Sequence, residues 1–171
     1  AGRPRPGPDV LEVELQTTAG GAAQLFWADE LGFTEPQSVR LTLQPSADRP
    51  QQLRFPFPSH GVRWLRFDPS DADADITIAR LQLVDAQRRV MRTYDATALK
   101  PANQIAAIRQ DGGAIHITPT PGANDPIVYM ALGCSVPQSG ALRLLTVTSW
   151  SAIVVAGLAW PSRRWSVSSG L

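Results

Sequence analysis

Apolar and polar residues alternate along much of the chain, a pattern typical of strands with one face buried and the other in water. Residues 11–16 read Leu-Glu-Val-Glu-Leu-Gln, and a similar alternation returns in residues 39–44 and 53–57. Further candidate strands are residues 76–83, 90–94, 105–109, 114–118 and 127–132. We therefore expect strands to dominate the region from residue 9 to residue 133.

One of these segments changes phase along its length. Ile76 and Ile78 occupy one face of the alternation, whereas Leu81 and Leu83 continue it one residue out of step. An extra residue in one strand of an antiparallel pair produces such a shift. The slip after Ala79 therefore predicts a β-bulge.

Clusters of Gly, Pro, Asp and Ser separate the expected strands. They occupy residues 18–21, 45–50, 58–61, 68–75, 110–113 and 119–125. Many short strands with such punctuation are typical of a sandwich or jelly roll. A helical turn is expected only within residues 96–106, where Pro101 limits its length. We predict an all-β, two-sheet, jelly-roll-like sandwich over residues 9–133. Its core should include Leu41, Phe55, Phe67, Ile78 and Leu83.

The composition changes after the last expected strand. Residues 144–160 carry no charge, and the longer segment 142–160 would form a helix of about 28 Å against a hydrocarbon core of ~30 Å. Trp160 stands where an interfacial aromatic ring is expected. We expect residues 142–160 to be a transmembrane helix; the alternative is that residues 144–159 form two further buried strands.

Flanking charges predict the orientation of this span. Arg163 and Arg164 follow it, whereas only Arg143 lies at its start, so the positive-inside rule places the C-terminus in the cytoplasm. The sandwich would then face the periplasm or the exterior. The expected segments are a disordered arm over residues 1–8, the sandwich over 9–133, a linker over 134–141, the span over 142–160 and a cytoplasmic tail over 161–171.

The overall charge limits the choice of partners. The chain has 16 basic and 15 acidic residues, and its formal net charge is +1. A nucleic-acid-binding domain concentrates basic residues on one face. We therefore expect no nucleic-acid partner.

Four carboxylates at short intervals form a candidate metal site, namely Asp68, Asp71, Asp73 and Asp75. Their spacing is similar to the start of a calcium-binding loop. Counted from Asp71, however, Ile76 and Gln82 stand where an EF-hand loop requires Gly and Glu. One interpretation is a structural calcium site, and the other is a solvated turn before a strand.

The segment from Trp27 to Glu35 is the candidate ligand site. Its candidate residues are Trp27, Asp29, Glu30, Phe33 and Glu35. Aromatic rings stack on the C–H faces of sugars while carboxylates bond to hydroxyl groups, so this combination suits a glycan. The alternative is that Phe33 plugs the end of the sandwich and that most rings pack in its core.

Three segments carry a resemblance to a known group of proteins. Residues 24–38 read Gln-Leu-Phe-Trp-Ala-Asp-Glu-Leu-Gly-Phe-Thr-Glu-Pro-Gln-Ser; residues 65–69 read Leu-Arg-Phe-Asp-Pro and lead into the strand at 76–83; and residues 103–126 open with Asn-Gln-Ile and close with Asn-Asp-Pro. Together they resemble the extracytoplasmic β domains of large bacterial membrane proteins of surface-polysaccharide assembly. These include multi-spanning glycosyltransferases and proteins of rhamnan or O-antigen synthesis.

The resemblance implies a carbohydrate-binding-module-like domain beside an anchor in the bacterial inner membrane, and it carries over no catalytic residue. We expect a non-catalytic accessory domain whose partners are the membrane, a glycan or lipid-linked saccharide, and other membrane proteins of the pathway. A purely structural domain that binds no sugar is the alternative, and a fragment of a membrane glycosyltransferase is a third. An independent hydrolase lacks sequence support, because the chain has no nucleophile elbow, phosphate loop or zinc spacing.

Overall fold

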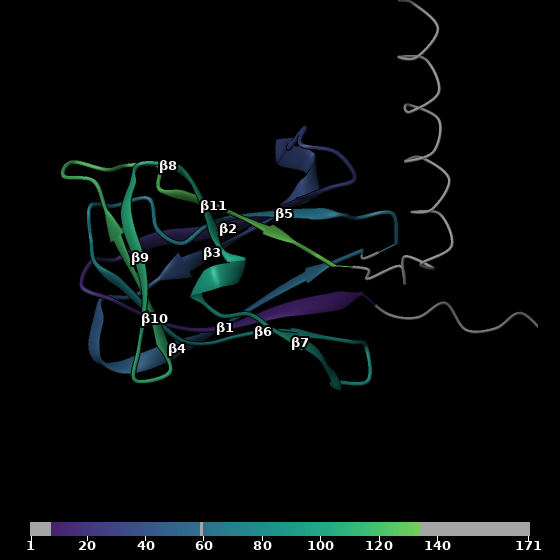
Figure 1. Cartoon of the computed structure of the whole chain (residues 1–171), viewed down its shortest axis with the longest axis horizontal. Coiled ribbons are helices and arrows are strands. Elements are labelled where there is room, and N and C mark those ends of the chain that lie inside the picture. Colours follow the sequence, from purple (N-terminus) through teal and green to yellow (C-terminus); the bar gives the residue numbers. More distant parts are fainter. Residues whose placement is uncertain (1–7, 59, 134–171) are drawn as a thin grey trace, which may run out of the picture. The chain divides into compact units, whose positions relative to one another are not determined.

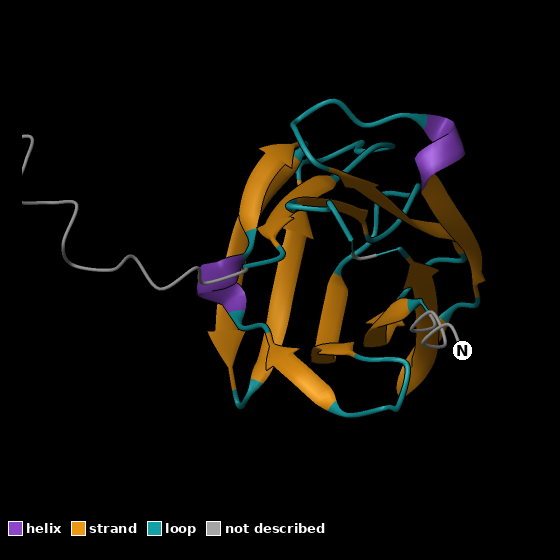
Figure 2. Ribbon diagram, turned by 90° about the vertical axis from the view of Figure 1, so that its right-hand side faces the viewer, coloured by secondary structure: helices purple, strands orange, loops and turns teal. Residues whose placement is uncertain are grey.

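The computed structural model describes residues 8–58 and 60–133, and this part of the chain is an antiparallel β-sandwich. Its two sheets enclose a common interior, as the view along the sandwich shows (Figure 2). The prediction of an all-β, two-sheet fold is therefore confirmed. The described residues contain two short 3-10 turns, η1 (Glu35–Gln37) and η2 (Ala96–Ala98), and η2 lies in the segment where a helical turn was expected.

The larger sheet has the strand order β4-β1-β6-β10-β9, and β7 pairs with the end of β6 that β10 leaves free (Figure 1). Its strands are β4 (Ser46–Phe57), β1 (Asp9–Thr17), β6 (Ile76–Val84), β10 (Ala114–Pro119), β9 (Ile105–Asp111) and β7 (Val90–Thr93). The alternation predicted for β1 and β10 holds, because Ile115 and Ile117 are buried while His116 between them bonds through Nδ1 to the Thr77 hydroxyl at 3.2 Å.

The smaller sheet has the strand order β3-β2-β5-β11-β8. Its strands are β3 (Ser38–Leu43), β2 (Gly21–Ala28), β5 (Trp64–Asp68), β11 (Ile127–Ala131) and β8 (Lys100–Asn103). Strands that are far apart in sequence are therefore neighbours, and the last described strand lies between β5 and β8. This sheet carries the candidate site described below.

The core fills the space between the two sheets. Of the five predicted core residues, Phe55, Phe67 and Ile78 are fully buried, Leu83 is nearly so, and Leu41 is half-buried against the core cluster. The rings of Phe55 and Phe67 meet edge to face across the two sheets, with centroids 5.8 Å apart. The buried core cluster of the described residues draws its members from Leu11 to Leu132.

The β-bulge predicted after Ala79 is present. In the pairing of β6 with β1, Arg80 lies opposite Glu14 and Ile78 lies opposite Leu15, which leaves Ala79 as the extra residue. Ala79 and Arg80 both face solvent, while Ile78 and Leu81 on either side are buried. The phase slip in the sequence therefore marks a real irregularity of the strand.

The expectation of a turn over residues 45–50 is largely wrong, because β4 already begins at Ser46. Ser46 pairs with Thr17 after a register shift that accommodates the intervening residues. Pro50 is tolerated here because β4 is an edge strand, where a missing N–H costs little. Polar, Pro-containing sequence in an edge strand thus looks like a turn when read by itself.

Several expectations fall outside the described residues. They are the disordered arm, apart from Pro8, and the linker, transmembrane helix and tail from residue 134 onward. Within residues 8–58 and 60–133, no helix is long and apolar enough to cross a membrane.

Candidate ligand-binding cleft

Strand alternation places a row of polar and aromatic side chains on the outer face of the five-stranded sheet. Leu65 and Phe67 of β5 point into the core, so Arg66 and Asp68 between and beyond them point outward. The register then aligns Phe26, Arg66 and Tyr129 across three neighbouring strands. In the next row, Gln24 lies between its partners Arg40 and Asp68.

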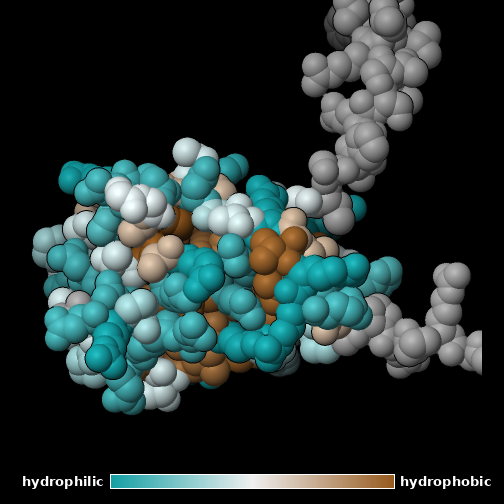
Figure 3. Space-filling model, turned by 90° about the horizontal axis from the view of Figure 1, so that it is seen from below, coloured by the Kyte–Doolittle hydropathy of each residue, from teal (hydrophilic) through white to brown (hydrophobic). Residues whose placement is uncertain are grey.

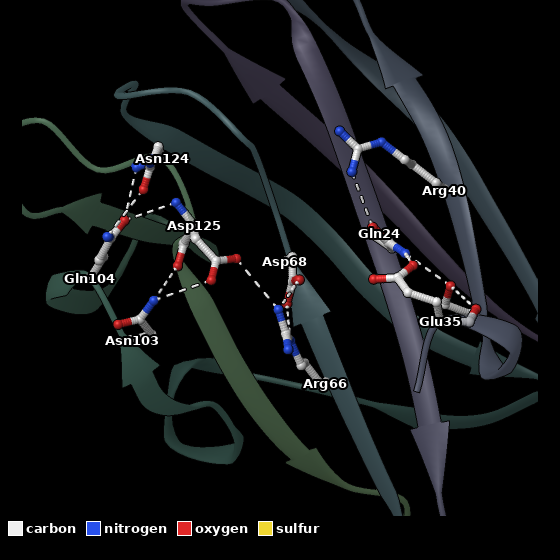
Figure 4. A network of polar contacts seen from close by, with 10 residues as sticks. Gln24, Glu35, Arg40, Arg66, Asp68, Asn103, Gln104, Asn124 and Asp125 are labelled. Atoms are coloured by element: carbon white, nitrogen blue, oxygen red, sulfur yellow. Dashed lines mark hydrogen bonds and ion pairs between the residues drawn. The ribbon is translucent and has the colours of Figure 1, made fainter. Parts of the chain in front are cut away.

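These rows border an open cleft of about 450 Å³. Side chains of β2, β3 and β5 form its floor, and the segments around Asp71 and Asp125 form its rim. Figure 4 shows the polar side chains of this region pointing toward one another from separate strands and from the loops beside them.

Arg66 and Asp68 form the centre of the cleft. The guanidinium donates two hydrogen bonds to the carboxylate, from Nε to Oδ1 at 2.8 Å and from Nη2 to Oδ2 at 2.7 Å. The guanidinium carbon also lies 4.6 Å from the ring centroid of Phe26, which gives a cation–π contact. Arg66 is therefore held flat against the sheet, with both its position and its orientation fixed.

Burial governs the electrostatics of this pair. Asp68 is 8% exposed, and desolvation raises the pKa of its carboxyl above the ordinary value of 3.8, while the hydrogen bonds from Arg66 act in the opposite direction. The hydrogen bonds to Asp68 raise the pKa of Arg66. The pair is thus a fixed dipole at the base of the cleft.

The carboxamide side chain of Gln104 fixes one rim of the cleft. Its Oε1 accepts hydrogen bonds from the backbone N–H groups of Asn124 and Asp125, both at 2.8 Å. Asn103 donates to the backbone carbonyl of Asp125 at 2.8 Å. The carboxylate of Asp125 is thereby directed toward Arg66, whose Nη2 lies 3.4 Å away.

The opposite rim is built around Gln24. Its Nε2 donates to Glu35 Oε2 and to the Ser38 hydroxyl, both at 2.9 Å, while its Oε1 accepts from Arg40 at 3.2 Å. Arg40 also pairs with Asp71 at 2.5 Å. A single buried amide thus connects the loop after β2 with the edge strand β3.

A stacked pair of aromatic rings lies beside the cleft. The loop after β2 folds back over the sheet and places the Phe33 ring on Tyr129 of β11, with centroids 5.5 Å apart and an interplanar angle of 23°. Both side chains are partly exposed. Trp64 is a third partly exposed ring, and its position in β5 assigns it to the same outer face as Arg66.

The structure separates the residues of the Trp27 to Glu35 candidate site. Trp27 lies on the core side of β2, where its ring stacks on Phe57 at 6.2 Å. Asp29 and Glu30 are exposed in the loop, and a hydrogen bond from the Glu30 N–H to Asp29 Oδ1 is local to it. Phe33 and Glu35 reach the outer face beside the cleft, so only these two of the five candidates lie together there.

The four aspartates of the candidate calcium site do not converge. Asp68 pairs with Arg66 and Asp71 with Arg40, while Asp73 accepts a hydrogen bond from the backbone N–H of Gly122 at 2.7 Å. The part of the chain that the structure describes contains no group of three or more potential metal ligands. Asp68, Asp71 and Asp73 thus each take a different partner from a different part of the fold.

A second open cleft, of about 410 Å³, lies on the outer face of the six-stranded sheet. Glu12 and Arg54 form an ion pair there at 3.2 Å, and Glu14 pairs with Arg80. Figure 3, seen from the side of this sheet, shows a mostly hydrophilic surface. No aromatic ring lines this cleft. It therefore lacks the stacking surfaces that accompany the first cleft.

Comparisons of the chain with protein-family models, with curated proteins and with solved structures find no match. The residues of the first cleft nevertheless come from segments that the sequence had already singled out. The three segments that carry the resemblance, residues 24–38, 65–69 and 103–126, all contribute side chains to the cleft and its rims. The sequence indicated Asp68 only as a candidate metal ligand, and neither Arg66 nor the stacking partner Tyr129 was predicted as a site residue, although the segment 65–69 contains both Arg66 and Asp68.

Proposed function

We propose that this sandwich is a non-catalytic accessory domain of a bacterial membrane protein in cell-surface polysaccharide assembly, and that the cleft on its five-stranded sheet binds glycan. The proposal includes a jelly-roll-like domain outside the inner membrane and a membrane span at residues 142–160. Its partners would be a glycan or lipid-linked saccharide and other membrane proteins of the pathway.

The observation that carries the proposal is the convergence of the three resemblance segments on one cleft. They supply a fixed Arg–Asp pair, amide and carboxylate side chains on both rims, and the ring of Phe33 stacked on Tyr129. Sugars require such a combination, because hydroxyl groups bond to oriented polar groups and pyranose C–H faces pack on rings.

The balance of charge around the cleft indicates the class of glycan. Four carboxylates lie at the cleft and two arginines compensate them; the carboxylates are Glu35, Asp68, Asp71 and Asp125, and the arginines are Arg40 and Arg66. Both arginines are already paired with aspartates. A uronate or phosphate group would meet repulsion without a free cation, so the cleft favours neutral glycans.

We expect neutral polysaccharides to bind the sandwich at least tenfold more tightly than acidic ones of the same backbone, because like charges at an interface reduce affinity. Calorimetric titration with matched neutral and carboxyl-bearing oligosaccharides measures the ratio. Raising the salt concentration should narrow the gap, since salt screens the repulsion. Tighter binding of the acidic set at low salt would contradict the assignment.

Phe33→Ala and Tyr129→Ala should each weaken glycan binding about fivefold, because stacking contributes ~1 kcal/mol per ring pair. The Phe33 ring lies outside the core, so the melting temperature of Phe33→Ala should remain close to that of the parent. Trp27→Ala is the control, because Trp27 packs against the core and its loss should lower stability. Thermal melts combined with glycan titrations separate the two effects, and unchanged binding in both ring variants would refute the stacking role.

A purely structural domain is the second candidate function. The observation in its favour is that Gln24, Arg66 and Asp68 already have partners within the fold. Under this alternative the parent domain binds no member of a diverse glycan array. Variants of Arg66 and Asp68 still lose stability, as they do if the domain binds glycan.

A further inference from the structure

The hairpin between β6 and β7 presents an unusual surface. Its turn is tied by Asp85, whose Oδ1 accepts hydrogen bonds from the backbone N–H groups of Gln87 and Arg89, both at 2.9 Å. The backbone also closes the turn, with the Asp85 N–H donating to the Arg89 carbonyl at 3.0 Å. The turn is therefore a defined structure rather than a loose loop.

Large apolar side chains stand exposed directly after this turn. Val90 is 55% exposed and Met91 is 57% exposed. Among the described residues, only Leu31 is another large apolar side chain of this kind. Arginines flank the two side chains, Arg88 and Arg89 before them and Arg92 after them. The hairpin thus combines exposed apolar side chains with three arginines, of which Arg89 is paired with Asp85 at 2.7 Å.

The position of Arg88 adds a conformational observation. Its φ is 62°, in the left-handed region where glycine or asparagine is favoured in hairpin turns. An arginine at this point makes the turn less favourable than glycine would. Its exposed side chain has no ion-pair partner among the described residues, and it lines the cleft on the six-stranded sheet.

The hairpin lies where the described chain ends. Arg92 donates from Nη1 to the carbonyl of Ala131 at 3.3 Å, and a Cβ atom on Gly133 would collide with the same guanidinium. Figure 1 shows the β6–β7 hairpin and the end of β11 at the same end of the sandwich. The uncharged run, residues 144–160, begins eleven positions after Gly133, so the chain can place its start at most about 40 Å from Gly133.

We propose that the β6–β7 hairpin is a membrane-docking element, in which Val90 and Met91 enter the headgroup layer and Arg88 contacts anionic lipid phosphates. Arginine beside apolar side chains is the composition that lipid interfaces bind, because hydrophobic burial and attraction to anionic headgroups act together. A lipid surface is chosen over a protein partner because the chain leaves the sandwich beside this hairpin and leads into the uncharged run.

This inference does not depend on glycan binding. The cleft lies on the five-stranded sheet, whereas the hairpin extends the six-stranded one. Vesicle binding and glycan binding can therefore fail separately. Docking by the hairpin would fix the orientation of the sandwich on the membrane and keep the cleft at a defined height above the lipid.

The test uses residues 1–133, because Ala1–Cys134 forms one compact unit and the core cluster of the described residues lies within it. Cosedimentation is measured with vesicles of phosphatidylcholine and phosphatidylglycerol in equal amounts, and with vesicles of phosphatidylcholine alone, at low ionic strength. The domain should bind the mixed vesicles and bind neutral vesicles much more weakly. Arg88→Gln should weaken binding about fivefold, the change that one basic residue near an anionic surface produces. Val90→Ser combined with Met91→Ser should weaken it about tenfold.

Arg49→Gln is the matched control, because Arg49 is an exposed arginine on β4 near the Ser46–Thr17 pairing, away from the hairpin. It should leave vesicle binding unchanged. Arg88→Gly adds a second readout, since glycine suits the left-handed turn: the melting temperature should stay level or rise while binding falls. The proposal is overturned if mixed vesicles do not bind the parent domain, or if Arg49→Gln weakens binding as much as Arg88→Gln.

Discussion

Phe67→Ala should lower the free energy of unfolding by ~3–5 kcal/mol, the range found when a buried Phe is truncated to Ala. Phe67 has no exposed surface, and its ring meets Phe55 of the opposite sheet edge to face at an interplanar angle of 74°. Its neighbours in the register, Leu25 and Val128, are also fully buried. Truncation at this point would therefore leave a cavity among fully buried side chains.

Urea unfolding followed by tryptophan fluorescence measures this loss. Phe33→Ala is the matched control, because the same change is made on a partly exposed ring outside the core. It should cost less than about 1 kcal/mol. Equal losses in the two variants would show that Phe67 does not occupy the centre of the core.

Arg66→Met should destabilise the domain by about 2–3 kcal/mol near neutral pH, because it leaves the Asp68 carboxylate buried without its ionic partner. The value lies below that of a fully buried pair, since the Arg66 side chain is 23% exposed. Burial already raises the pKa of Asp68 above 3.8, and Arg66 holds it down. Without Arg66, the pKa of Asp68 in the folded state should rise further.

The pH dependence follows from the sign of this change. A carboxyl whose pKa is raised in the folded state binds protons more readily there than in the unfolded chain, so its ionisation destabilises the fold as pH rises through the folded-state pKa. The cost of Arg66→Met should therefore be greatest near neutral pH. It should shrink as the pH falls through the raised pKa of Asp68 toward 3.8, the ordinary value of the carboxyl.

Unfolding curves of Arg66→Met and of the parent, recorded at neutral and at mildly acidic pH, measure this effect. The double variant Arg66→Met/Asp68→Leu is the second arm, because it removes the unpaired charge and should recover most of the lost stability. A cost that is independent of pH, or a double variant less stable than the single one, would show that the pair is not the source of the effect.

Alternation predicted the strands that bury one face, and it failed where both faces are covered. In β1, Leu11, Val13 and Leu15 are buried while the intervening side chains are not, and this strand is readable from the sequence. In β2, Gln24 and Phe26 on the outer face are also buried, so no period of two is visible. Residues outside β2, such as Arg66 and Glu35, cover these two side chains and bury them. The local pattern of apolar and polar residues does not reveal that covering.

The candidate site was predictable only in part for the same reason. Phe33 and Glu35 are near each other in sequence and both reach the outer face. Trp27 lies on the opposite side of β2, in contact with Phe57. The prediction grouped Trp27 with Phe33 and Glu35 as one site because the three residues are close in sequence. The pairing of β5 with β2 and β11 brings Arg66 beside Phe26 and Tyr129, and such long-range register depends on the whole fold.

The order of strands in the five-stranded sheet has a consequence for biosynthesis. β11 is the last described strand, yet it lies between β5 and β8 and joins them into one sheet. As the chain leaves the ribosome, β5 and β8 remain open edges until residues 127–131 have emerged. Unpaired edges are templates for pairing with other chains, so the nascent domain is most exposed to aggregation just before its synthesis ends. The face that bears the cleft is therefore completed after translation of nearly the whole sandwich, and a chaperone that shields strand edges would act in this interval.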